Sequence, residues 1–313
     1  MTERVLVTPR SMTSPPPRLD ALRELGADVV LGPPGRQPTR EELQQVLPGI
    51  TAWIAGVETI DDDLLRFAPR LHTLARNGVG VDSIDTDAAA RRGIRVLNTP
   101  GANADGVAEL SIALLLALMR DLGAASTALR AGGWHRVTGR ELGTATLGIV
   151  GLGAIGSRVA AIALGFGTEV LGFDPKVSPE AAGGAELTGL GDLLARSDAV
   201  SIHIPGAANG TPLITDDELA QMRAGSFLIN TARWSVVDPD ATLSALDAGH
   251  LGGYGLDVFA QEPPRPHRLL AHPRVLATPH LGAFTRESAA RAAQAAIDNV
   301  AAALRAERVD ADS

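Results

Sequence analysis

The amino-acid sequence predicts an α/β protein with two doubly wound parallel sheets, one in each of two domains. Short apolar runs alternate with helical patterns along most of the chain, which is typical of β-α-β units. A length of 313 residues fits two domains. A second series of apolar runs opens at residue 146, and a glycine-rich turn directly follows its first member.

The first series of predicted strands lies within the first hundred residues. Its members are residues 4–8, 27–31, 52–56, 71–75 and 94–98. Two helical patterns separate some of them, at residues 41–47 and 61–67. Pro38-Thr39 and a run of three aspartates suit their N-terminal ends. Residues 104–120 are then predicted to form a helix that is apolar nearly all round, so we expect it to be buried between layers.

The second series of predicted strands comprises residues 146–151, 169–174, 199–205, 226–231, 254–259 and 275–280. Residues 284–308 are predicted to form one long helix, which we expect to return to the first domain. The predicted domains are therefore a discontinuous one, residues 1–99 with 283–313, and a continuous one, residues 100–282.

Composition excludes several classes of protein. Hydrophobic residues make up 45% and charged residues 20%, as in ordinary globular proteins. The absence of cysteine excludes disulfides, thiolate metal sites and a cysteine nucleophile, and we predict no metal site. A net charge of −8 without a basic cluster argues against nucleic acid as a partner. The longest near-apolar run, residues 110–119, is about half a bilayer span, and the N-terminus lacks an apolar signal segment, so we expect a cytoplasmic protein that does not bind membranes.

A glycine-rich turn predicts a dinucleotide site. Gly151, Gly153 and Gly156 have the G-x-G-x-x-G spacing, which is weak evidence by itself. The turn lies between a predicted strand and a predicted helix at residues 157–164, which strengthens the prediction. The first glycine permits the tight turn, the second lets backbone N–H groups approach a pyrophosphate, and the third packs helix on strand.

The predicted strand after this turn ends at Asp174, where a carboxylate would accept hydrogen bonds from the adenosine ribose. A carboxylate here favours NAD because it would repel a 2′-phosphate. Lys176, two residues further on, weakly argues against this preference for NAD, although it is also explained as a solvated lysine.

Three later strand ends each carry one suitable polar residue, namely Arg233, Glu262 and His280. Ligands of open α/β sheets bind beyond the carboxyl ends of the strands. A dehydrogenase of alcohols needs an acid/base, an orienting carboxylate and a cation for the substrate carboxylate. Singly, each residue also has a structural explanation, as a turn cap, a solvated glutamate or a structural histidine.

Seven motifs occur in a fixed order: "NGVGVDSID", "NTPGANADGVAEL", "GLGAIGSRVA", "VSIHIP", "INTARxxxVD", "GLDVFxxEP" and "TPHLGA". In these motifs the chain resembles the NAD-dependent D-2-hydroxyacid dehydrogenase family over nearly its whole length. The resemblance implies two Rossmann-like domains with the active site in the cleft between them. Closure over the substrate would use hinges at residues 98–102 and 279–282.

The resemblance also implies roles for the three strand-end residues. His280 would be the general acid/base, and Glu262 would hydrogen-bond the far imidazole nitrogen, fix the tautomer and stabilise the imidazolium. Arg233 would bridge the substrate carboxylate and the C2 oxygen through its planar fork. The presence of Glu262 argues against the formate dehydrogenase branch, which uses a glutamine near its histidine.

Further residues follow from the resemblance. Asp257 would orient the nicotinamide carboxamide, and Thr231 and Ala232 would line the ring. The implied cofactor-binding residues are Gly151, Gly153, Ala154, Ile155, Gly156, Asp174, His203, Thr231, Ala232 and Asp257, the role of His203 being the least defined. The implied substrate-binding residues are Arg76, Asn77, Gly78, Val79, Gly80, Asn103, Arg233 and Trp234.

The substrate is left open among small anionic D-2-hydroxy acids. Arg76 matches the arginine with which 3-phosphoglycerate dehydrogenases hold the substrate phosphate, although a surface or salt-bridged arginine is the alternative. A second arginine, usual at the end of the preceding strand, is missing here, and Gly56, Val57 and Glu58 stand in that region. The candidates are 3-phosphoglycerate, then hydroxypyruvate or glyoxylate, then a phosphonopyruvate-type acid. No regulatory domain is expected after residue 313. A remote alternative of another class is an NAD-sensing corepressor.

Three aromatic residues need an explanation. Trp234 and Phe284 occupy positions where the family usually has small residues, either walling the active site or packing between domains or subunits. We expect a homodimer formed through the NAD-binding domain. Trp134 in "AGGWHR" resembles part of a dimer arm, the alternative being a helix end packed on its own core.

Overall fold

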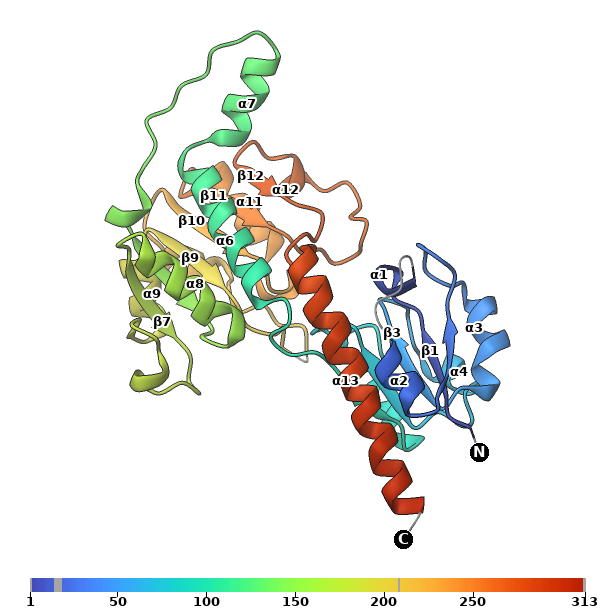
Figure 1. Cartoon of the computed structure of the whole chain (residues 1–313). Coiled ribbons are helices and arrows are strands. Elements are labelled where there is room, and N and C mark those ends of the chain that lie inside the picture. Colours follow the sequence, from blue (N-terminus) through green and yellow to red (C-terminus); the bar gives the residue numbers. More distant parts are fainter. Residues whose placement is uncertain (1, 14–18, 208, 312–313) are drawn as a thin grey trace. The chain divides into compact units, whose positions relative to one another are not determined.

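The computed structural model describes residues 2–13, 19–207 and 209–311, and it divides into two compact units. Unit 1 comprises Met1–Asn103 with Arg286–Ser313, and unit 2 comprises Ala104–Thr285. Each unit contains one parallel sheet with helices packed against it (Figure 1). The predicted fold class, two parallel-sheet α/β domains, is confirmed. The sequence predicted domain boundaries after residues 99 and 282, whereas the two units divide after residues 103 and 285.

The sheet of unit 1 has five strands in the order β2-β1-β3-β4-β5, and every neighbouring pair is parallel. Their bounds are β1 (Arg4–Val7), β2 (Asp28–Leu31), β3 (Ala52–Ala55), β4 (Thr73–Arg76) and β5 (Arg95–Leu97). Trp53 in the middle strand is fully buried, and its indole N–H donates to Thr8 Oγ1 over 2.9 Å. Because β3, β4 and β5 are parallel neighbours, their carboxyl ends form one continuous edge of the sheet.

Helices of unit 1 cover this sheet. They are α1 (Arg10–Thr13), α2 (Asp20–Glu24), α3 (Arg40–Val46), η1 (Leu47–Gly49), α4 (Asp62–Leu65), α5 (Thr86–Arg91) and α13 (Arg286–Ala311). Thr39 and Glu42 close a capping box at the start of α3, and Asp61 caps α4. The long helix α13 packs against α2, β3 and β4 through buried alanine, isoleucine, valine and leucine side chains (Figure 1).

The sheet of unit 2 has seven parallel strands in the order β12-β11-β10-β9-β6-β7-β8. Their bounds are β6 (Thr146–Val150), β7 (Glu169–Phe173), β8 (Glu186–Leu187), β9 (Ala199–Ile202), β10 (Ser226–Asn230), β11 (Leu251–Leu256) and β12 (Val275–Ala277). The chain leaves β6 toward β7 and later returns to the other side of β6 with β9. This switch point is where doubly wound sheets bind ligands, at the carboxyl ends of the two strands.

The helices of unit 2 are α6 (Ala104–Met119), α7 (Leu122–Arg130), η2 (Leu142–Thr144), α8 (Ala154–Gly165), η3 (Pro179–Ala181), α9 (Leu190–Arg196), α10 (Asp216–Gln221), η4 (Trp234–Val236), α11 (Pro239–Asp247) and α12 (Arg268–Ala271). The expectation that α6 is buried is confirmed, because it packs against α8, β10 and β11. Among the described residues, no single helix is long and apolar enough to cross a membrane. By length and composition alone the bent pair α6 and α7 would suffice.

Three strands end three residues earlier than the sequence predicted. β9 ends at Ile202 rather than at residue 205, β11 at Leu256 rather than at residue 259, and β12 at Ala277 rather than at residue 280. The residues beyond these ends belong to loops, and His280 has a φ of +53°, which lies outside the β region. Apolar or β-branched residues continue past all three ends, so composition alone does not mark where the loops begin.

Candidate active site

The candidate active site lies on one edge of the unit 2 sheet. Arg233 follows the end of β10, Glu262 follows β11, and His280 follows β12. These three strands are parallel neighbours, so their carboxyl ends meet at the same edge. The sequence-predicted trio is thus carried by adjacent strand ends of a single unit.

His280 and Glu262 are hydrogen-bonded to each other. The distance from His280 Nδ1 to Glu262 Oε1 is 2.7 Å, and both side chains are about half exposed. A carboxylate at Nδ1 keeps the proton of a neutral imidazole on that nitrogen, which leaves the lone pair on Nε2. Within the described residues nothing contacts Nε2 by a hydrogen bond. This nitrogen can therefore take up and return a proton.

Asp257 braces the loop that carries His280. Its side chain is 1% exposed, and one oxygen, Oδ1, accepts from Thr278 Oγ1 over 2.6 Å and from Leu281 N over 2.7 Å. The other oxygen, Oδ2, accepts from Gly282 N over 2.9 Å. Charge-assisted bonds of this kind are roughly twice as strong as neutral ones. They hold the Thr278 side chain before His280 and two backbone N–H groups after it, and the left-handed conformation of His280 costs about 1–2 kcal/mol.

The expected role of Asp257 toward a nicotinamide carboxamide has to coexist with these three bonds. A carboxylate offers about four acceptor positions, so one remains for a further donor. Sequence reasoning assigned Asp257 to the cofactor and missed its contact with the histidine loop. Thr278, which supplies one of the three donors, was not singled out either, and no pattern in the sequence marks it.

Asn230 shapes the turn that carries Arg233. The buried Asn230 side chain accepts from Ala232 N over 3.0 Å and donates to the Arg233 carbonyl over 2.9 Å. The Arg233 guanidinium in turn donates to the carbonyl oxygen of Ala232 over 2.8 Å. Asn230 was not predicted as a site residue, although an asparagine at the end of an apolar strand is a usable signal for a side-chain-stabilised turn.

Thr231 and Trp234 connect this turn to two other parts of unit 2. The buried Thr231 hydroxyl lies 2.9 Å from Ser111 Oγ of α6, another residue that sequence reasoning missed. The Trp234 ring stacks on Phe259 at 6.4 Å between centroids and lies edge-on to His267 at 6.1 Å. The tryptophan therefore packs inside unit 2 and links the Arg233 turn to the segment that carries Glu262. That it also borders the substrate stays a prediction.

The glycine-rich turn has the geometry that a dinucleotide needs. Gly151 has a φ of +93°, and a Cβ there would lie 2.7 Å from the carbonyl oxygen of His203. A Cβ on Gly156 would collide with the carbonyl oxygen of Gly151, so helix α8 packs on β6 only with glycine. Gly153 is exposed, and a Cβ added there would meet no atom within 4 Å, which leaves an open approach to the first turn of α8 at Ala154 and Ile155. These features fit a pyrophosphate at a helix N-terminus.

Asp174 lies directly beside this turn. Its Oδ2 accepts from Leu152 N and its Oδ1 from Lys176 N, each over 2.9 Å. Each carboxylate oxygen keeps capacity for a further donor, as binding of two ribose hydroxyls requires. Lys176 is thus tied to Asp174 through its backbone.

His203 follows β9 across the switch point from Gly151. Burial lowers the pKa of its imidazole to about 3, so the ring is neutral at pH 7. Its Nε2 lies 2.8 Å from Ser201 Oγ, while Nδ1 is buried without a partner among the described residues. The imidazole therefore has one free position for a hydrogen bond.

The predicted residues of unit 1 lie at and after the end of β4. Arg76 is half buried and donates to the carbonyl oxygen of Asn77, and no carboxylate within the described residues lies within 4.0 Å of it. Gly78 has a φ of +147°, and a Cβ there would lie 2.6 Å from the Arg76 guanidinium. In the described part of the chain, the backbone N–H groups of Val79 and Gly80 find no acceptor. Two free N–H groups beside a guanidinium suit an anion.

The remaining predicted residues are placed as follows. Asn103 immediately precedes α6, and its side-chain oxygen is buried without a partner among the described residues. Phe284 is 75% exposed. Trp134 is 79% exposed, so it does not pack on the core of its own unit. No group of three or more histidine, aspartate or glutamate side chains suited to a metal ion occurs in the described segments.

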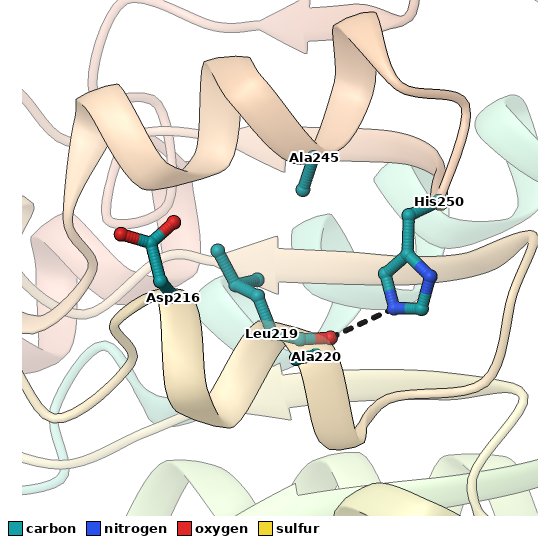
Figure 2. A pocket seen from close by; sticks show the side chains of 5 residues that line it. All are labelled: Asp216, Leu219, Ala220, Ala245 and His250. Carbon is teal, nitrogen blue, oxygen red and sulfur yellow. Dashed lines mark hydrogen bonds between the residues drawn. The ribbon is translucent and has the colours of Figure 1, made fainter.

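Figure 2 shows an open pocket elsewhere in unit 2. It is lined by Asp216, Leu219, Ala220, Ala245 and His250, and His250 Nε2 donates to the carbonyl oxygen of Leu219 over 2.9 Å. His250 directly precedes β11, so it lies at the amino end of the strand whose carboxyl end leads to Asp257. The pocket is therefore remote from the His280 edge.

Replacing Asp257 by asparagine is expected to release the histidine loop. The amide would turn an N–H toward a backbone N–H that now donates to the carboxylate, and an unmatched donor costs about 1–3 kcal/mol. We expect the amide hydrogens of Leu281 and Gly282 to exchange at least about 10-fold faster with solvent. Hydrogen exchange followed by NMR or mass spectrometry measures this. Thr278→Val, which removes one hydroxyl donor only, is the matched control, and unchanged protection in Asp257→Asn would contradict the brace.

Comparison with known proteins agrees with this geometry. The family model for the NAD-binding domain of D-isomer-specific 2-hydroxyacid dehydrogenases matches residues 112–282. D-3-phosphoglycerate dehydrogenase of Mycobacterium tuberculosis is 41% identical over 277 residues, which is 87% of this chain and 52% of the relative. The chain thus spans about half the length of such relatives. Hydroxypyruvate reductase of Thermotoga maritima is 37% identical over 258 residues, covering 80% of this chain and 84% of the relative.

Solved structures are similar over almost the whole chain. A glyoxylate reductase from Paecilomyes thermophila is 28% identical with a TM-score of 0.86, covering 97% of this chain and 95% of that one. D-lactate dehydrogenase from Aquifex aeolicus, complexed with NAD and lactic acid, is 28% identical with a TM-score of 0.81, covering 97% and 96%. From the matched domain, the sequence identity and the shared fold, the chain belongs to the D-isomer-specific 2-hydroxyacid dehydrogenase family.

Proposed function

We propose that this protein is an NAD-dependent dehydrogenase that transfers a hydride between nicotinamide and C2 of a small anionic D-2-hydroxy acid or its 2-keto acid. The observation that carries the proposal is the 2.7 Å pair of His280 and Glu262, with Arg233 at a neighbouring strand end of the sheet that also presents the glycine-rich turn. An acid/base, its orienting carboxylate and a cation are thereby gathered at one edge.

Proton transfer is assigned to His280. In the oxidative direction its Nε2 takes the proton of the substrate hydroxyl, and in the reductive direction it returns a proton to the carbonyl oxygen. Glu262 at Nδ1 holds the ring orientation and stabilises the imidazolium that forms. Arg233 pairs with the substrate carboxylate through two parallel N–H groups, which orients C2.

NAD supplies the hydride acceptor or donor. Its pyrophosphate would lie on the backbone at Gly153 and the first turn of α8, and its adenosine ribose would bond to Asp174. The buried Thr231 and Ala232 and the remaining acceptor position of Asp257 would contact the nicotinamide side. The carboxylate of Asp174 favours NAD because it would repel a 2′-phosphate.

Residues of unit 1 are proposed to bind the substrate as well. The free N–H groups of Val79 and Gly80 are suited to a carboxylate, and Arg76 and Asn77 precede them in the same loop. The names of the relatives favour 3-phosphoglycerate and hydroxypyruvate as candidates, with glyoxylate and phosphonate 2-keto acids behind them. An NAD-sensing corepressor is the remote alternative, and an absence of turnover on every 2-keto acid would favour it.

The central test is NADH oxidation with a panel of 2-keto acids that includes phosphorylated and phosphonate members. We expect His280→Ala to lower kcat/KM by about 10²- to 10⁴-fold, as removal of a general acid/base does. Glu262→Gln should reduce it less, because the acid/base itself remains. His135→Ala is the matched control, since His135 forms a similar 2.7 Å pair with Asp121 away from the strand ends. Full turnover by His280→Ala would refute the mechanism.

We also propose that the protein is a cytoplasmic homodimer whose unit 2 provides the contact. Helix α7 has no buried residue and projects from the rest of unit 2 (Figure 1). The following segment carries the exposed Trp134 and Val137. Exposed apolar side chains in such number mark an interaction surface.

A double substitution of two exposed apolar residues, Leu129→Asp in α7 and Trp134→Asp, is expected to convert the dimer into monomers of 32.4 kDa, because charges would be buried at the contact. Light scattering coupled to size-exclusion chromatography measures the mass. Phe166→Asp, on another exposed apolar residue of unit 2, is the control. A monomeric wild type would contradict the proposed assembly.

A further inference from the structure

Unsatisfied polar atoms gather at one edge of the unit 1 sheet. The described part of the chain contains eight buried side-chain nitrogen or oxygen atoms that have no hydrogen-bond partner. Five of them lie at or just after the carboxyl ends of β3, β4 and β5, namely Glu58 Oε1 and Oε2, Arg76 Nε, Asn77 Oδ1 and Thr99 Oγ1. Buried polar groups are usually paired, so a cluster of exceptions indicates a place where a ligand completes the bonding.

Glu58 is the most demanding member of this cluster. It is only 6% exposed, and both carboxylate oxygens lack a partner among the described residues. The side chain folds back over Gly56, where an added Cβ would lie 3.1 and 3.2 Å from the two oxygens. Burial of a carboxylate without a donor is costly, because the oxygens have lost water and gained nothing. A hydrogen-bond donor from a ligand would remove that cost.

Arg76 is the neighbouring charge. It pairs in register with Ala55 of β3, three residues before Glu58. Burial lowers the pKa of the Arg76 guanidinium, while the carboxylates of Glu58 and Asp82 oppose that shift, so Glu58 acts on Arg76 electrostatically. No guanidinium nitrogen of Arg76 nevertheless lies within 4.0 Å of a Glu58 carboxylate oxygen, since no ion pair joins them among the described residues. Glu58 and Arg76 therefore offset each other's charge without a direct bond. The Glu58 carboxylate oxygens and Arg76 Nε stay available to a ligand.

This charge arrangement disfavours a phosphate. A dianion attracted by Arg76 would also be repelled by Glu58, and the pair together contributes no net positive charge. An ammonium group would satisfy Glu58 but would leave Arg76 as a second cation beside it. A neutral hydroxyl satisfies Glu58 as a donor without disturbing the balance, because Arg76 already offsets the carboxylate.

We propose that Glu58 determines substrate specificity by accepting a hydrogen bond from a hydroxyl group of the substrate, and that it excludes substrates that carry a phosphate at that position. The inference rests on the proposed function and narrows it to hydroxylated 2-keto or 2-hydroxy acids. It selects hydroxypyruvate-type compounds over 3-phosphoglycerate-type compounds, although Arg76 by itself would favour the phosphate.

The test compares three 2-keto acids that differ at C3 only: hydroxypyruvate, pyruvate, which lacks the hydroxyl, and 3-phosphohydroxypyruvate, in which it is phosphorylated. With NADH, we expect the wild type to have a kcat/KM at least about 10-fold higher for hydroxypyruvate than for either other compound, because sites that bond a substrate hydroxyl reject analogues without it. In Glu58→Gln the ratio of phosphorylated to hydroxylated substrate should rise at least about 10-fold, since one negative charge is removed at constant size.

Glu41→Gln is the matched control, because it removes the same charge from an exposed position on α3 of the same unit. It should leave the substrate ratio unchanged. Glu58→Ala, checked for folding by circular dichroism, provides a second variant and should lose the preference for hydroxypyruvate over pyruvate. An unchanged ratio in both Glu58 variants, or a wild type that prefers the phosphorylated compound, would overturn the proposal.

Calorimetric titration separates this inference from the proposed function. Binding of hydroxypyruvate and 3-phosphohydroxypyruvate to the NAD-loaded protein requires no chemistry. A preference for hydroxypyruvate that is lost in Glu58→Gln would support the role of Glu58 even if no 2-keto acid were reduced. Equal binding of both compounds by wild type and variant would overturn it even if reduction proceeds, and would indicate that water alone bonds Glu58.

Discussion

The candidate active site depends on the buried carboxylate of Asp257. Its two oxygens accept hydrogen bonds from the Thr278 hydroxyl and from the backbone N–H groups of Leu281 and Gly282, and so hold the loop on both sides of His280. These bonds help to offset the cost of the left-handed conformation of His280. The alignment of the histidine with Glu262 depends on that backbone, because a hydrogen bond of 2.7 Å tolerates little displacement.

Parallel strands explain why the remaining groups meet where they do. In unit 2, adjacent strands end at the same edge and release Arg233, Glu262 and His280 from three separate loops. Unit 1 repeats the principle with Glu58 and Arg76, which follow or end neighbouring strands. The sheets supply rigidity and common direction, while the short loops supply chemistry. The charge at the unit 1 edge is what separates the phosphorylated from the hydroxylated candidate substrates.

Much of the fold and of the glycine-rich turn was predictable, because residues close together in the sequence determine both. Apolar runs located eleven of the twelve strands found in the described residues, and the two-residue strand β8 is too short to leave such a pattern. The partners of Asp257 were not predictable, since they lie 21 to 25 residues away and join β11 to the loop after β12. Ser111 was missed for the same reason, because its partner Thr231 lies 120 residues away. Asn230, in contrast, bonds to residues two and three positions away, so its place at the end of an apolar strand could have indicated its role. That Glu58 is buried without a hydrogen-bond partner among the described residues was also not predictable, because spacing along the sequence does not show which side chains are buried.

The positioning of His280 by Asp257 is tested most directly by the ¹⁵N NMR spectrum of the His280 ring in the wild type and in Asp257→Asn. With the loop braced, the neutral imidazole should be the Nδ1–H tautomer, because Glu262 accepts from that nitrogen. In the variant, the released loop should give a mixture of both tautomers. Identical His280 signals in the two proteins would contradict the claim that Asp257 positions the acid/base.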